Sequence, residues 1–302
     1  VNGRNNIGGL VGASFGNIEN SVSYADVTST GESAGGLVGI MNGNIINSMA
    51  TGNLTNTSTG SYMGGLVGHI TGNVTNSTAS GIVNAKGNNI GGLIGYAGGN
   101  VTGGVSTGNV YGNKYTGGLI GNATGKVIAS FSTSNVEGGA FTGGLIGQTT
   151  ADIKESYAKG NVTSSGYYAG GLLGYLAGGG VTLDSNFALG DVTGTMGVGG
   201  LIGATTETKI NYTLSNSYAS GYVTANQGGT AGGLIGFTNG GTIFNVKATG
   251  NVTVSGNNGD ENALYNFNFS TGNTSNGYKV ASAGGLIGLG INGTCLLYTS
   301  PS

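Results

Sequence analysis

The sequence has very little of the residues on which disulfide-stabilised and catalytic proteins usually depend. Its 302 residues include one cysteine, one proline, one histidine and no tryptophan. A single cysteine excludes an intramolecular disulfide framework, and a single proline excludes a collagen-like triple helix although the chain has 68 glycines. A lone histidine is a poor basis for a zinc site or a catalytic triad, because each needs several partner groups.

Charged side chains are also scarce. They make up 7% of the residues and leave a formal net charge of -2, whereas ordinary globular proteins have about 25% charged residues. This composition excludes a basic nucleic-acid-binding surface and an acidic tail. No stretch reaches the roughly 18 consecutive apolar residues of a membrane span. We therefore expect no nucleic-acid partner and no membrane insertion, while a hydrophobic content of 37% argues against disorder.

What the chain does have is a repeat. The pattern Gly-Gly-Leu-(Val/Ile/Leu)-Gly occurs ten times at intervals of 26 to 33 residues, with one last interval of 52. The copies begin at Gly8, Gly35, Gly64, Gly91, Gly117, Gly143, Gly170, Gly199, Gly232 and Gly284. Matches at a nearly constant period indicate a repeat architecture.

Aligning the repeats gives further columns, each of one physical character. One column holds only serine and alanine: Ser23, Ala50, Ala79, Ser106, Ser132, Ala158, Ala188, Ala219 and Ala248. A second column is apolar throughout: Val27, Leu54, Val83, Val110, Val136, Val162, Val192, Val223 and Val252. A third apolar column precedes the small one: Ile18, Ile45, Val74, Val101, Val127, Ile153, Leu183, Leu214 and Ile243.

These columns predict an all-β fold, a parallel β-solenoid (β-helix) of about ten coils with roughly 27 residues per coil. Glycine disfavours helices, because each one costs about 1 kcal/mol relative to alanine. Short β-branched segments between Gly, Asn, Ser and Thr favour strands and turns, and we expect about three strands per coil. Residues of one column would stack about 4.8 Å apart along a rod roughly 48 Å long. We expect the repeated leucine inside and the small column where two walls approach.

The residue after the repeated leucine is apolar in every copy, from Val11 to Ile287. Strict alternation along a strand would place this column outside, as a hydrophobic ribbon that another surface could cover. The alternative is a corner of the chain, helped by the flanking glycines, that buries both residues. We favour burial, because protein interiors are closely packed.

With these motifs the sequence resembles the GLUG repeat of bacterial secreted and cell-surface proteins. The resemblance rests on Gly-Gly-Leu-Val-Gly followed by Gly-x-Ile-x-Asn-Ser-x-Ala-x-Gly-x-Val, and it covers nearly the whole chain. GLUG repeats occur in adhesin-like proteins and beside the catalytic domain of some IgA-specific metallopeptidases. The resemblance therefore implies an extracellular, bacterial, non-catalytic repeat region. It does not imply peptidase activity, because the chain has no His-Glu-x-x-His motif.

The repeat also suggests how the chain is divided. Residues 1–291 are expected to form the solenoid domain, and Val1 falls in mid-coil, so we expect the natural protein to continue upstream. The long last interval predicts an inserted loop or hairpin at 254–283. Residues 292–302 contain Cys295 and the only proline and lack the repeat, so we interpret them as a tail foreign to the native protein.

The insertion is the candidate binding segment, because insertions in repeat proteins often carry binding. Aromatic side chains within 257–279 would stack on sugar faces of host or environmental glycans, with two carboxylates as polar contacts. The candidate residues are Asp260, Glu261, Tyr265, Phe267, Phe269 and Tyr278. The alternative is that these aromatic side chains fold back onto the rod and cap it.

No residue pattern points to a cofactor, a metal or a catalytic centre. His69 follows a glycine block at a variable position, and we interpret it as a surface substitution. The densest charge group, Asp152 with Lys154, Glu155 and Lys159, is interpreted as a solvated patch. Asparagine recurs before the small column, for example at Asn47, where stacked amides could form a ladder. The numerous Asn-x-(Ser/Thr) sequons follow from the repeat, and we assign no glycosylation to them.

The leading hypothesis is a non-catalytic structural or adhesive region of a large bacterial surface or secreted protein, acting as a stiff spacer that displays binding loops. Its partners would be glycans or surface proteins, together with further repeats of the same chain. A glycan-binding module using residues 257–279 is the alternative. More remote are a polysaccharide-degrading β-helix enzyme and an ice-binding face on a broken threonine column: Thr28, Thr55, Thr163, Thr193, Thr224 and Thr253.

Overall fold

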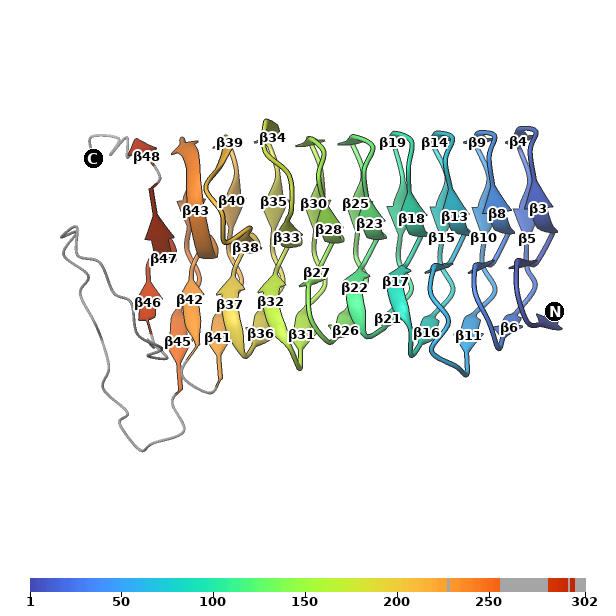
Figure 1. The fold of residues 1–302 in the computed structure, drawn as a ribbon, viewed down its shortest axis with the longest axis horizontal. Coiled ribbons are helices and arrows are strands. Elements are labelled where there is room, and N and C mark those ends of the chain that lie inside the picture. The colour runs from blue at the N-terminus through green and yellow to red at the C-terminus, as the bar shows by residue number, and fades with distance from the viewer. Residues whose placement is uncertain (227–228, 256–281, 293, 297–302) are drawn as a thin grey trace.

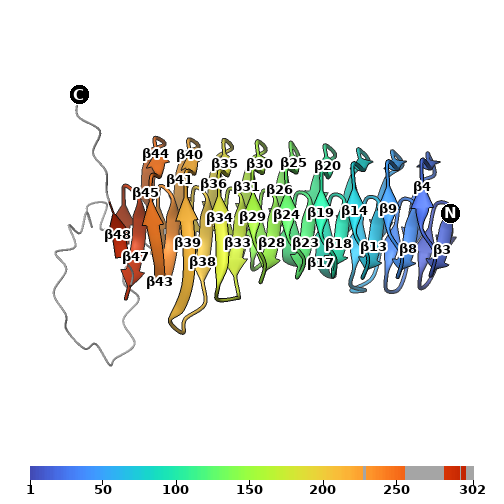
Figure 2. The same cartoon turned by 90° about the horizontal axis from the view of Figure 1, so that it is seen from above.

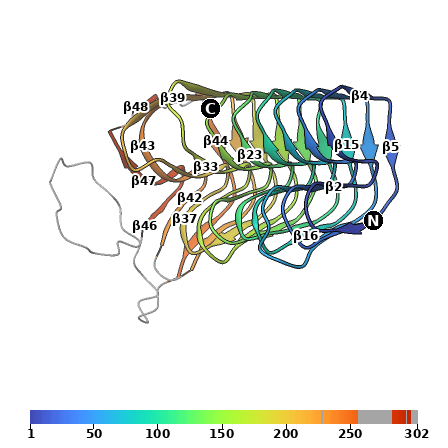
Figure 3. The same ribbon diagram turned by 45° about the vertical axis from the view of Figure 1, so that its right-hand side comes forward.

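The computed structural model describes residues 1–226, 229–255, 282–292 and 294–296, and in them the chain forms a parallel β-solenoid without a helix (Figure 1). The coils lie side by side from the N-terminal end to the C-terminal end, and they follow nearly the same path when the rod is turned toward the viewer (Figure 3). The rows that contain ten strands enclose nine turns of the chain. The predicted fold class is therefore confirmed, with about nine turns.

Five rows of short strands run along the rod, numbered here in chain order from the glycine block (Figure 2). Row 1 consists of β2 (Ile7–Gly8), β7 (Ala34–Gly35), β12 (Met63–Gly64), β17 (Asn88–Gly91), β22 (Lys114–Gly117), β27 (Thr142–Gly143), β32 (Tyr167–Gly170), β37 (Met196–Gly199), β42 (Thr230–Gly232) and β46 (Ser282–Gly284). Row 2 consists of β3 (Val11–Ser14), β8 (Val38–Met41), β13 (Val67–Ile70), β18 (Ile94–Ala97), β23 (Ile120–Ala123), β28 (Ile146–Thr149), β33 (Leu173–Leu176), β38 (Ile202–Thr205), β43 (Ile235–Phe244) and β47 (Ile287–Ile291).

Row 3 is joined to row 2 through the long strand β43. It consists of β4 (Ile18–Glu19), β9 (Ile45–Ile46), β14 (Val74–Thr75), β19 (Val101–Thr102), β24 (Val127–Ile128), β29 (Ile153–Lys154), β34 (Val181–Asp184), β39 (Ile210–Ser215) and β48 (Thr294–Leu296). Backbone pairing with β43 thus continues at β48, beyond the last residue of the repeat pattern.

Row 4 consists of β5 (Val22–Ser23), β10 (Met49–Ala50), β15 (Thr78–Ala79), β20 (Val105–Ser106), β25 (Phe131–Ser132), β30 (Tyr157–Ala158), β35 (Phe187–Ala188), β40 (Tyr218–Ala219) and β44 (Lys247–Ala248). Row 5 consists of β1 (Asn2–Gly3), β6 (Val27–Ser29), β11 (Leu54–Asn56), β16 (Val83–Ala85), β21 (Val110–Tyr111), β26 (Val136–Gly138), β31 (Val162–Ser164), β36 (Val192–Gly194), β41 (Val223–Ala225) and β45 (Val252–Val254). The expectation of three strands per coil was wrong, because tight corners divide each coil into five segments.

Neighbouring coils pair in parallel, with residues of the same sequence column opposite each other. Leu54 pairs with Val83, and Val67 pairs with Ile94. A column in the sequence is therefore a line of side chains along the rod. The threonine column follows this rule on row 5, where Thr163, Thr193 and Thr224 lie in adjacent coils.

The repeated leucine and the residue after it are both buried, as we favoured from the sequence. Leu145 and Ile146 are each 0% exposed, and the same holds in the other interior coils to within 1%. The backbone N–H groups of Leu145 and Ile146 both donate to the carbonyl of Leu172 in the next coil, each at 2.9 Å. The chain thus bends between rows 1 and 2, and this bend directs two consecutive side chains into the core.

The small column packs against the second glycine of the block. A Cβ atom at Gly144 would lie 2.1 Å from the carbonyl oxygen of Gly171 and 3.0 Å from the Cβ atom of Ala158. The equivalent contact recurs between Gly36 and Ala50, again at 3.0 Å. The prediction that small side chains lie where two walls approach is confirmed.

Before row 4 the chain turns through a left-handed corner. Asn20, Asn47 and Asn76 have φ of 46° to 49° there, in the region that asparagine adopts more readily than most residues. Backbone geometry therefore explains most of the asparagine preference. Within this column the side-chain amide of Asn47 donates to Asn20 at 3.4 Å and that of Asn245 donates to Asn216 at 2.5 Å, so the expected ladder forms in part.

Candidate functional site

The binding residues predicted in the insertion are not among those that the structure describes. Residues 256–281 lie outside the described ranges, and with them the whole predicted set: Asp260, Glu261, Tyr265, Phe267, Phe269 and Tyr278. Glycan binding by this segment stays a prediction. A different candidate surface lies on the side of the rod, among the described residues.

Four aromatic side chains form a stack on the outer face of row 4, which we call the row-4 aromatic ladder. Its members are Phe131, Tyr157, Phe187 and Tyr218, on β25, β30, β35 and β40. Successive ring centroids are 4.8, 4.6 and 5.2 Å apart, and the ring planes are within 3° to 8° of parallel. The ladder therefore spans four adjacent coils without a break.

Local structure explains why these rings point outward. Each row-4 strand has two residues, and alternation along a strand sends one side chain in and the other out. The second residue belongs to the small buried column, so the first must face solvent. Parallel pairing of Phe131 with Tyr157, Tyr157 with Phe187, and Phe187 with Tyr218 then places the rings in register.

Sequence analysis missed this ladder, although the signal was present in the column that precedes the small residues. That column reads Val22, Met49, Thr78, Val105, Phe131, Tyr157, Phe187, Tyr218 and Lys247. It has no single residue class, so it was not singled out. Its meaning becomes visible only when the column is known to face outward.

The charged side chains beside the ladder lie in its two middle coils and, at Lys247, in the coil that follows Tyr218. The Lys159 ammonium lies 5.0 Å from the centroid of the Tyr157 ring, within the range of a cation–π interaction. Asp184 accepts hydrogen bonds from the Ser215 hydroxyl at 2.5 Å and from the Asn216 amide at 2.7 Å. The Ser215 hydrogen bond is the main cause that lowers the pKa of Asp184 below its usual value, so this carboxylate is ionised and already has partners.

A second group of rings lies where row 1 meets row 2; its central ring is covered by the others, whereas Tyr167 at its edge is 41% exposed. Phe141 is 9% exposed and contacts Tyr115, Tyr167, Tyr168 and Tyr175 at centroid distances of 4.8 to 5.7 Å. Burial, and then the neighbouring Glu207, raise the pKa of Tyr168 to about 12. The packing of these rings against each other is typical of a stabilising cluster.

His69 is the outward-facing, partly exposed residue of β13, in agreement with a surface position, but it packs against two aromatic neighbours. Its ring stacks on Tyr96 at 4.9 Å with an interplanar angle of 7°, and Tyr62 approaches edge-on at 5.5 Å. Burial lowers the pKa of His69 from its ordinary value. The residue is thus half-buried between aromatic neighbours on row 2.

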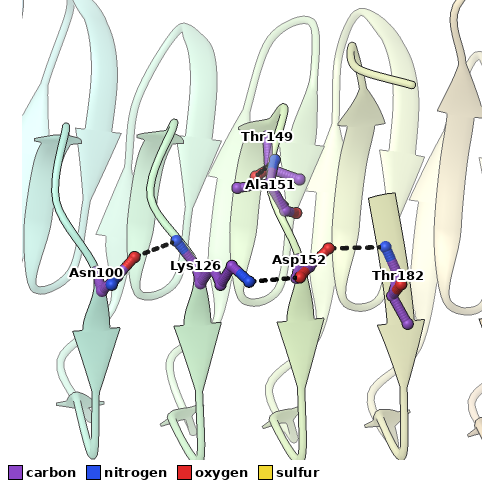
Figure 4. A network of polar contacts seen from close by, with 6 residues as sticks. All are labelled: Asn100, Lys126, Thr149, Ala151, Asp152 and Thr182. Carbon is purple, nitrogen blue, oxygen red and sulfur yellow. Dashed lines mark hydrogen bonds and ion pairs between the residues drawn. The ribbon is translucent and has the colours of Figure 1, made fainter. Parts of the chain in front are cut away.

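Two ladders of asparagine side chains, which sequence analysis also missed, connect the coils. In each, a side-chain oxygen accepts the backbone N–H of the next coil. Before row 3, Asn17 accepts from Asn44 at 3.0 Å, and Asn100 accepts from Lys126 at 2.9 Å (Figure 4). Before row 5, Asn135 accepts from Asn161 at 2.9 Å. This role explains why Gly-Asn-Val-Thr recurs in the sequence.

Lysine interrupts the first asparagine ladder, and an ion pair takes the place of the missing amide. The Lys126 ammonium lies 3.2 Å from Asp152, whose other oxygen accepts the Thr182 N–H at 2.9 Å (Figure 4). Burial alone would raise the pKa of Asp152, but the Thr182 N–H and the Lys126 charge outweigh it and lower the pKa. Asp152 is therefore part of a coil-to-coil connection, not only of a solvated patch.

Because the Asp152 pKa is lowered in the folded state, we expect Asp152→Asn to reduce the loss of stability in acid. In an unfolded chain aspartate titrates at about pH 4. The contribution of Asp152 to the free energy of unfolding is therefore fully present above that pH and is lost as the pH falls through the lower pKa of the folded state. Urea midpoints at pH 7 and pH 3 should differ less in the variant than in the wild type. Lys126→Gln, which removes the partner charge, should act in the same direction. Equal pH dependence in all three proteins would contradict this assignment.

In the part of the chain that the structure describes, no group of three or more His, Cys, Asp or Glu side chains could hold a metal ion. The same residues include no helix long and apolar enough to cross a membrane. An open cleft of about 290 Å³ between β34, β39 and β43 is lined by polar groups such as Thr182, Thr213 and Lys209.

The geometry defines the chain as a parallel β-solenoid built from short glycine-rich repeats. More particularly, the family described as "The GLUG motif" matches residues 59–84, which run from the end of one coil through β12, β13, β14 and β15 into β16. The suspected GLUG repeat is thus confirmed. Comparison with curated proteins gave no match, and comparison with solved structures gave none.

Proposed function

We propose that the chain is a stiff, non-catalytic repeat region of a bacterial surface or secreted protein, acting outside the cell as a spacer with adhesive function. Its partners would be glycans or surface proteins, and further repeats of the same chain would extend it. The GLUG motif and the solenoid support a repeat region of this kind.

The observation that carries the proposal is the continuity of coil-to-coil bonding. Backbone N–H groups of each coil donate to the next, as in the leucine pairs of rows 1 and 2, and asparagine side chains add bonds at the corners. Each coil is therefore held to its neighbours by many parallel bonds. Bending the rod would strain bonds in every row, so stiffness follows from the architecture.

Small-angle X-ray scattering tests this proposal. We expect the scattering of a rod with a constant cross-section and a core length of about 43 Å, which nine turns at about 4.8 Å each would give. Single-molecule stretching should show cooperative resistance. A scattering profile of a flexible chain, or extension without resistance, would rule out the spacer.

A further inference from the structure

We propose that the row-4 aromatic ladder is a binding platform for a neutral polysaccharide that lies along the rod axis. This goes beyond a spacer that only displays loops, because the shaft itself would bind. The ladder is separate from residues 257–279. It consists of described residues that pair in register on four adjacent strands.

Stacking covers part of each ring face and leaves part of it exposed: Phe131, Tyr157 and Phe187 are partly exposed, and Tyr218 is 40% exposed. Centroids are 4.6 to 5.2 Å apart although the planes are nearly parallel. Rings in contact, with carbon atoms about 3.5–4.0 Å apart, must then be slipped by roughly 3 Å, which is the usual offset arrangement. Each ring therefore covers only part of the next, and the ladder presents partly open faces in a regular series. Such faces attract the partially positive C–H groups on the face of a sugar ring.

The charge around the ladder favours a neutral ligand. Within three residues of a ladder ring along the chain there are two cations, Lys154 and Lys159, and two anions, Glu155 and Asp184. The anion Asp184 is already held by hydroxyl and amide donors. Lys247, which pairs with Tyr218 in the next coil, adds one cation at the end of the column. The surface beside the rings therefore has one net positive charge, which gives a polyanion or a polycation little attraction. Hydroxyl-bearing neighbours such as Thr133 and Ser220, both exposed, are suited to the polar rim of a sugar.

The exposed area is too small for a stable contact with a second copy of this chain. Tyr218 is the most exposed ring of the ladder, at 40%. Aromatic side chains offer about 150–250 Å² each, so the four rings together expose less than about 400 Å², whereas a standard interface buries about 800 Å² per partner. A linear sugar chain needs only a narrow strip.

Affinity gel electrophoresis of the full chain tests the proposal, with hydroxyethylcellulose, laminarin and galactomannan as neutral probes and polygalacturonate as a charged comparator. We expect at least one neutral polysaccharide to retard the protein. Combined Tyr157→Ala and Phe187→Ala should weaken this binding by at least about tenfold, because two neighbouring contact faces are lost. Combined Tyr157→Leu and Phe187→Leu, which keeps apolar bulk without an aromatic face, should weaken it similarly and covers the case in which the alanine variant misfolds.

Two controls separate the ladder from other surfaces. Tyr222→Ala removes a tyrosine that is 60% exposed but outside the ladder, and should leave binding unchanged. Deleting residues 257–279 should also leave it unchanged. The proposal is overturned if no polysaccharide retards the protein, if only polygalacturonate does, or if the ladder variants bind normally. It is also overturned if the wild type self-associates and the ladder variants do not, because the ladder would then be a contact between copies of the chain. Small-angle X-ray scattering on the same samples measures the rod shape independently of binding. The spacer proposal and the binding-platform proposal can therefore be refuted separately.

Discussion

Replacing Gly144 with alanine should disrupt the solenoid between β28 and β33. The new Cβ atom would lie 2.1 Å from the backbone carbonyl oxygen of Gly171, and the neighbouring coil cannot move away without losing its own bonds. We expect a destabilisation above about 4 kcal/mol, in the exceptional range for one substitution. Because solenoids are stabilised coil by coil, hydrogen exchange should show the loss of protection centred on these two strands.

Gly16→Ala is the matched control, because a Cβ atom at Gly16 would have no neighbour within 4 Å. Its urea midpoint should equal that of the wild type or rise slightly, since alanine restricts the unfolded chain. If Gly144→Ala also unfolded at the wild-type urea concentration, the close approach of the two walls would be refuted.

Truncating either of two consecutive core residues should cost nearly the same. Leu145→Ala and Ile146→Ala each remove a side chain that is 0% exposed, and such cavities cost about 2–5 kcal/mol. An ordinary strand would bury only one of the two, so only one substitution would be severe. Ile82→Ala, at a side chain that is 45% exposed, should cost far less. Equilibrium urea unfolding compares the three variants, and a mild effect at Ile146 would contradict the bend between rows 1 and 2.

The fold could be predicted from the sequence because the core columns are uniform. Every repeat has a leucine after two glycines, and a small residue packs against the second glycine, as at Gly144. Both preferences follow from packing within one repeat and its neighbour. The number of strands per coil could not be predicted, because the left-handed corners depend on φ. At the equivalents of Asn47 the chain accepts Ala129 and Glu155 in the same conformation, with φ of 48° and 52°. A pattern of residue types does not show such corners.

The candidate surface was harder to predict than the core. Outward columns vary in composition, so Phe131 and Tyr157 did not stand out from Val105 in the same position. The aromatic contacts of His69 could not be predicted for a related reason: Tyr62 and Tyr96 come close to it only after the coils stack. The asparagine ladders could not be seen in the sequence because their hydrogen bonds join residues 26 to 30 positions apart.

In-register pairing of like columns has a consequence for how such a molecule can change over evolutionary time. Every coil offers its neighbours nearly the same surface, so gain or loss of one whole repeat leaves the remaining columns intact. Each such change alters the length of the rod by about 4.8 Å. Duplicating the coil that carries Phe187 would lengthen the aromatic ladder by one ring without disturbing the interior. The length of the rod and the composition of its outer face can therefore vary independently of the core.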